Sequence, residues 1–70
     1  MSRVSGLRDA LAAVRHDLGR AREAESVEAA RAALGRNADY VLGYHRAIVA
    51  TLEGVAHRLE LMVAGAERAE

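Results

Sequence analysis

The sequence of 70 residues contains no cysteine, proline, tryptophan, phenylalanine, lysine or glutamine. Without cysteine there can be no disulfide bond, thiolate zinc site or cysteine nucleophile. Without proline the chain lacks the strongest helix breaker. The residues that dominate instead are alanine, leucine, arginine and glutamate, which all favour helices, so an all-α protein is expected.

Charge is balanced, because ten arginines stand against ten acidic residues and the formal net charge is zero. The strong cationic field that binds nucleic acid or anionic membranes nonspecifically is therefore missing. Uncharged stretches such as Ala47 to Leu52 are far shorter than the roughly 20 residues of a membrane-spanning helix. The first residues also lack the apolar run of a secretion signal. We expect a single small domain in the cytoplasm, with no membrane partner.

Two amphipathic helices are predicted by apolar residues that recur every three or four positions. In the first helix, predicted over residues 3–34, the stripe consists of Val4, Leu7, Leu11, Val14 and Leu18. In the second, predicted over residues 38–68, it consists of Val41, His45, Ile48, Leu52, Val55, Leu59 and Met62. The second stripe is widened on one flank by Leu42, Val49, Ala56 and Val63. The second helix is thus the more apolar of the two.

A turn is predicted at residues 35–37, between the two helices. Gly35 suits the left-handed conformation that ends a helix, and Asn37 suits the cap of the next one. Asp39 would then stand in the first turn, where negative charge favours the helix dipole. A weaker interruption at residues 25–27, where the stripe slips in phase, predicts a bend rather than a second turn. Two arms of nearly equal length favour an antiparallel hairpin.

Two rows of charge predict the register of that hairpin. With spacings of seven, the rows are formed by Arg8, Arg15 and Arg22 in the first helix and by Glu53, Glu60 and Glu67 in the second. A fold about Asn37 places the rows on the same side and pairs Arg8 with Glu67, Arg15 with Glu60 and Arg22 with Glu53. Each exposed pair contributes only about 0–1 kcal/mol, so the rows indicate register rather than stability. The alternative interpretation is a solvated charged face without pairing.

The apolar sector of the second helix is too wide for the first helix to cover. Chains this short often need a disulfide, a metal or a second chain for stability, and disulfides are excluded here. A partner interface is therefore predicted at Tyr44, Ile48, Thr51, Val55, Leu59 and Met62. We expect a homodimeric four-helix bundle, or a small adaptor that binds a helix of another protein. The predicted function is a non-enzymatic module for protein–protein interaction or oligomerisation.

A strip of small residues forms a second, shallower face on the second helix. It consists of Gly43, Ala47, Ala50 and Gly54. Glycine inside a helix costs about 1 kcal/mol relative to alanine, so its presence suggests that another helix approaches closely. The alternative is that the glycines are simply tolerated in an alanine-rich helix.

Three other functions are weighed against the interaction module. His45, on the apolar stripe beside Tyr44, could meet its symmetry mate and hold haem or a metal, although a register-setting hydrogen bond is the simpler interpretation. A helix face that carries Glu53, His57 and Glu60 has permissive spacing for a metal. Weak nucleic-acid binding could involve Arg3, Arg8, Arg15, Arg20 and Arg22.

The sequence offers no catalytic machinery. No nucleophile stands at a reachable spacing from a base, and there is neither a glycine-rich phosphate loop nor a pair of buried carboxylates. We therefore expect no catalytic residues, no bound cofactor and no resident metal.

Two resemblances concern the layout of the chain. The stretch LRDALAAVRHDLGRAREAE, residues 7–25, resembles the N-terminal docking helices of modular polyketide synthases, which pair as dimeric coiled coils. The two-armed layout is similar to the small helical hairpins of type VII secretion. The Trp-x-Gly turn of those hairpins is replaced here by Gly35-Arg36-Asn37. Neither resemblance supplies a role for any residue of this chain.

Overall fold

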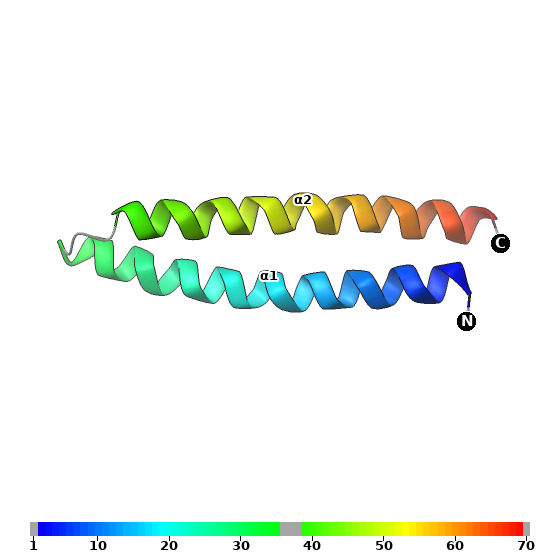
Figure 1. Ribbon diagram of the computed structural model, residues 1–70, viewed down its shortest axis with the longest axis horizontal. Coiled ribbons are helices and arrows are strands. Elements are labelled where there is room, and N and C mark those ends of the chain that lie inside the picture. The colour runs from blue at the N-terminus through cyan, green and yellow to red at the C-terminus, as the bar shows by residue number, and fades with distance from the viewer. Residues whose placement is uncertain (1, 36–38, 70) are drawn as a thin grey trace.

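The computed structural model describes residues 2–35 and 39–69, which form two long helices packed against each other (Figure 1). Helix α1 spans Arg3–Ala33 and helix α2 spans Asp39–Ala69. The helices run antiparallel, so the two ends of the chain lie together at one end of the hairpin (Figure 1). No strand occurs in the described residues. The predicted all-α helical hairpin is confirmed.

The ends of the helices follow from local sequence. Ser2 caps α1, since its side-chain oxygen accepts a hydrogen bond of 3.0 Å from the backbone N–H of Ser5. Beyond the other end of α1, Gly35 has a φ of 75°, the left-handed conformation predicted for it. Asp39 lies in the first turn of α2, where its charge favours the helix dipole. The predicted cap Asn37 lies outside the described residues.

The two helices meet along a seam that takes two residues from every seven. On α1 its most buried apolar residues are Val4, Leu11 and Leu18, and on α2 they are Leu42, Val49, Ala56 and Val63. Between these lie half-buried residues: Leu7, Val14 and Ala21 on α1, and His45, Leu52 and Leu59 on α2. The row predicted to widen the α2 stripe is thus its most buried part. The alternate residues of the predicted stripe lie beside the seam: Val41, Ile48, Val55 and Met62.

Helix α1 passes through residues 25–27 without a break, so this region is not a second turn. The stripe of α1 also keeps its phase, contrary to the sequence-based expectation. Its spacing of three and four residues continues beyond Ala21 through Glu25, which is half-buried, and Glu28, which is 9% exposed. The stripe therefore changes from apolar to acidic side chains rather than changing direction.

The packing between the helices is thin. Val4, the most buried apolar residue, still exposes 4% of its surface, and no described side chain is fully enclosed. The radius of gyration is 15.9 Å, against about 11 Å for a compact domain of this length. The accessible surface is 5118 Å², roughly 900 Å² more than a compact monomer of this mass exposes. A single hairpin therefore leaves an unusually large part of its surface uncovered.

We predict that Leu11→Ala destabilises the hairpin by about 2–3 kcal/mol, because it empties the largest position of the apolar cluster that Leu11 forms with Ala56 and Val63. Urea unfolding followed by circular dichroism measures the loss. Leu61→Ala is the matched control, since Leu61 is 60% exposed and its truncation should cost less than about 0.5 kcal/mol. Equal losses from both variants would contradict a core centred on this cluster.

Candidate functional site

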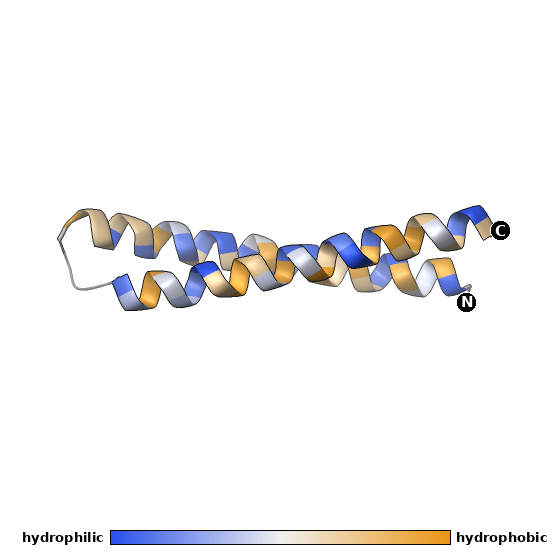
Figure 2. Ribbon diagram, turned by 90° about the horizontal axis from the view of Figure 1, so that it is seen from above, coloured by the Kyte–Doolittle hydropathy of each residue, from blue (hydrophilic) through white to orange (hydrophobic). Residues whose placement is uncertain are grey.

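Two long sides of the hairpin flank the seam and differ in chemistry. The first, here named the charged side, carries residues that directly follow a seam position: Arg8, Arg15 and Arg22 on α1, and Arg46, Glu53, Glu60 and Glu67 on α2. The second, the apolar side, carries residues that directly precede a seam position: Val41, Ile48, Val55 and Met62 on α2, and Arg3, Ala10, Asp17, Ala24 and Arg31 on α1. Seen from above, the helices cross, and apolar residues recur along both of them (Figure 2).

On the charged side, the structure brings together all three ion pairs suggested by the sequence. Guanidinium nitrogens lie 2.9 Å from the carboxylate in Arg8–Glu67, 3.4 Å in Arg15–Glu60 and 3.8 Å in Arg22–Glu53. The side chains in these pairs are about half exposed. Solvent therefore screens them, and each contributes little to stability. Their value lies in fixing which residue of α1 stands level with which residue of α2.

Two further ion pairs near the turn were not foreseen. Arg46 approaches Glu25 at 3.8 Å, and Arg31 approaches Glu28 at 2.8 Å. The first had a signal in the sequence, because Arg46 continues the glutamate row of α2 by one step of seven with the opposite charge. The Arg31–Glu28 pair had no signal in the sequence, since it depends on Glu28 lying at a seam position. Arg31 hydrogen-bonds this nearly buried carboxylate and so satisfies it.

We predict that Arg15→Glu and Glu60→Arg each destabilise the hairpin by a few tenths of a kcal/mol to about 1 kcal/mol, because each places like charges across the seam. The double variant restores the pair with its charges exchanged and should recover most of the loss. Thermal unfolding at low salt measures this double-mutant cycle, and 1 M salt should shrink the interaction. If both single variants unfold like the wild type, the pair does not set the register.

The apolar side of α2 remains largely open to solvent. Tyr44 is 62% exposed, Met62 46% and Val55 39%. With Thr51 and half-buried Ile48, they make up five of the six residues of the predicted interface. The sixth, Leu59, packs instead against the cluster between the two helices and therefore belongs to the seam.

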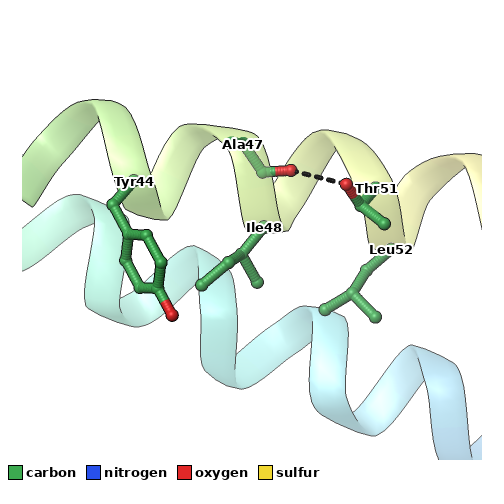
Figure 3. Close-up of a pocket in the computed structure, with 5 residues that line it drawn as sticks. All are labelled: Tyr44, Ala47, Ile48, Thr51 and Leu52. Atoms are coloured by element: carbon green, nitrogen blue, oxygen red, sulfur yellow. Dashed lines mark hydrogen bonds between the residues drawn. The ribbon is translucent and has the colours of Figure 1, made fainter.

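A shallow hollow of about 280 Å³ opens on this side of α2. Its lining residues are Tyr44, Ala47, Ile48, Thr51 and Leu52 (Figure 3). In Figure 3 the side chains of Tyr44, Ile48 and Leu52 project toward the α1 side of the helix. The Thr51 hydroxyl donates a 2.9 Å hydrogen bond to the carbonyl of Ala47. Because this hydroxyl is satisfied within α2, the hollow offers an almost wholly apolar surface.

The small-residue strip of α2 faces away from the seam. Its members Gly43, Ala47, Ala50 and Gly54 are all exposed. A Cβ atom added to either glycine would meet nothing within 4 Å. Within one hairpin, therefore, neither glycine is required for close packing.

We predict that Gly54→Ala stabilises α2 by about 1 kcal/mol, because it adds helix propensity without a steric conflict. The midpoint of thermal unfolding should rise accordingly. Gly43→Ala is the matched second site and should behave in the same way. A fall in stability for either variant would show that another helix packs closely against the strip.

The histidine candidates occupy different surroundings. His45 is half-buried on the seam, with its ring edge-on to Tyr44 at a centroid distance of 5.7 Å. His57 is exposed, while Glu53 and Glu60 pair with arginines of α1. Across residues 2–35 and 39–69, no three histidine, aspartate or glutamate side chains are placed to share a metal ion.

Three of the five arginines considered for nucleic-acid binding are the ones paired with glutamates, so a phosphate backbone would have to displace those carboxylates. In the described part of the chain, neither helix has the length and apolar character needed to cross a membrane. The cytoplasmic location stays a prediction.

Comparison with known proteins gives no match to a protein family, to a curated protein or to a solved structure.

Proposed function

We propose that this protein is a non-enzymatic interaction module that self-associates through the apolar side of α2. The observation that carries the proposal is the row of Val41, Ile48, Val55 and Met62, which stands beside the seam without a covering helix. α1 has no large apolar side chain with which to cover this row. Its residues in the corresponding row are Arg3, Ala10, Asp17, Ala24 and Arg31.

The contrast between the two sides supports this assignment. The charged side is occupied by ion pairs that join one helix to the other, so the side chains in these pairs add no large apolar residue to the surface. On the other side, the large exposed side chains Tyr44, Val55 and Met62 gather on a single helix. Exposed apolar surface that forms a patch, rather than single scattered residues, marks an interaction site.

The amount of uncovered surface agrees with a protein partner. A standard interface buries about 800 Å² on each partner. The excess surface of the hairpin over a compact monomer is of the same size, roughly 900 Å². Contact with another helical surface would give the thin seam a second layer and convert it into the core of a bundle.

We predict that Ile48→Asp abolishes self-association, because it places a charge in the middle of the apolar row. Sedimentation equilibrium at micromolar concentrations should find the wild type larger than a monomer and Ile48→Asp monomeric. Leu61→Asp introduces the same charge at a position that is 60% exposed and off the apolar side, and it should associate like the wild type.

Circular dichroism shows whether Ile48→Asp still folds, and Met62→Glu provides a second substitution at a more exposed site of the same row. A wild type that sediments as a folded monomer would contradict self-association.

A further inference from the structure

We infer that the occupant of the apolar side is a second copy of this chain, turned end for end about a two-fold axis that passes level with Thr51 and Leu52. This inference rests on the proposed function and adds the partner, its direction and its register. Two independent patterns lead to it, one on α2 and one on α1.

The first pattern is the apolar row of α2, which is symmetric about its own middle. Ile48 and Val55 stand equally far from the midpoint between Thr51 and Leu52, and so do Val41 and Met62. An antiparallel second copy centred there places Ile48 opposite Val55 and Val41 opposite Met62, each contact occurring twice. This register brings the whole row into contact, whereas a shift by seven residues leaves part of it uncovered.

The second pattern is the charge on the same side of α1. Asp17 and Arg31 are charged members of that row, and Ala24 stands midway between them. The third charged member, Arg3, lies at the far end of α1. The ion pairs of the charged side fix the register of the two helices, with Arg22 beside Glu53. By that register, Ala24 lies level with Thr51. The axis located from α2 therefore also passes midway between Asp17 and Arg31.

An antiparallel copy on this axis places Asp17 opposite Arg31 of the second copy, again twice. Both side chains are available, since Asp17 is 66% exposed and Arg31 is 56% exposed. Asp17 lies 3.8 Å from its neighbour His16, and Arg31 has one nitrogen on Glu28. The guanidinium has further N–H donors to offer a second carboxylate.

The hollow on α2 has a fitting occupant in this arrangement. Its centre lies near Ile48, and the residue opposite Ile48 is Val55 of the second copy. At the rim, Tyr44 stands within one residue of Arg58 of the second copy, where a guanidinium can stack on the phenol ring. The two Thr51 side chains face each other at the axis. Small side chains at that point allow the helices to approach closely.

The same axis separates the two copies of His45. They lie thirteen residues apart along the bundle, about 20 Å at the rise of an α-helix. In this dimer, therefore, the two His45 imidazoles cannot share a haem iron or a metal ion.

Single cysteine variants test the register directly, because the chain has no cysteine of its own. In mild oxidant, Thr51→Cys should convert most of the protein to a disulfide-linked dimer, since only residues at the axis meet their own copy. Ile48→Cys and Val55→Cys should stay largely unlinked. Ala50→Cys, exposed on the outer face next to Thr51, is the control for random collision.

Sedimentation of the reduced variants separates the two levels of the proposal. Linkage of Ile48→Cys or Val55→Cys instead of Thr51→Cys, in a protein that sediments as a dimer, would overturn the register and leave self-association standing. Disulfide linkage of Ile48→Cys, Thr51→Cys and Val55→Cys alike would indicate that the two α2 helices run parallel, and it would also overturn the antiparallel register. If the reduced variants and the wild type all sediment as folded monomers, self-association itself is overturned.

Discussion

The structure depends on a seam that is one side chain deep. Its positions recur with the heptad spacing of a coiled coil, and each helix supplies only a narrow stripe to it. Because two helices cannot surround their own contact, even the best-buried residues keep a few per cent of their surface in solvent. The elongated shape follows from this, and so does the importance of whatever covers the rest of the stripe.

Much of this arrangement could be predicted from the sequence. The spacing of three and four residues, the turn at Gly35 and the seven-residue rows of Arg15 and Glu60 indicated two helices, their direction and their register. These signals are reliable because they depend on local backbone geometry or on repetition along the chain. The structure describes both helices to within one residue of the expected bounds.

The details that could not be predicted have a common cause. The α2 stripe is wider than the seam, so periodicity alone could not say whether Val49 or Ile48 faces α1. In α1 the seam continues through Glu25 and Glu28. Because these residues are charged, the apolar spacing of the sequence does not reveal that they lie on the seam. In each helix, the shape of the opposite helix decides which residues are covered. That shape depends on side chains along the whole hairpin and not on local spacing.

The acidic continuation of the α1 stripe has a consequence for how the hairpin opens. Near the chain ends the seam is lined by leucine and valine, whereas toward the turn Glu25 and Glu28 replace them. Apolar contact between the helices therefore weakens toward the loop. Amide hydrogens close to the turn should exchange with solvent quickly, through small local fluctuations. Those around Leu11 and Val63 should exchange slowly, because their exchange requires the two helices to separate. The two helices are thus held together most firmly in the half of the hairpin that lies away from the turn.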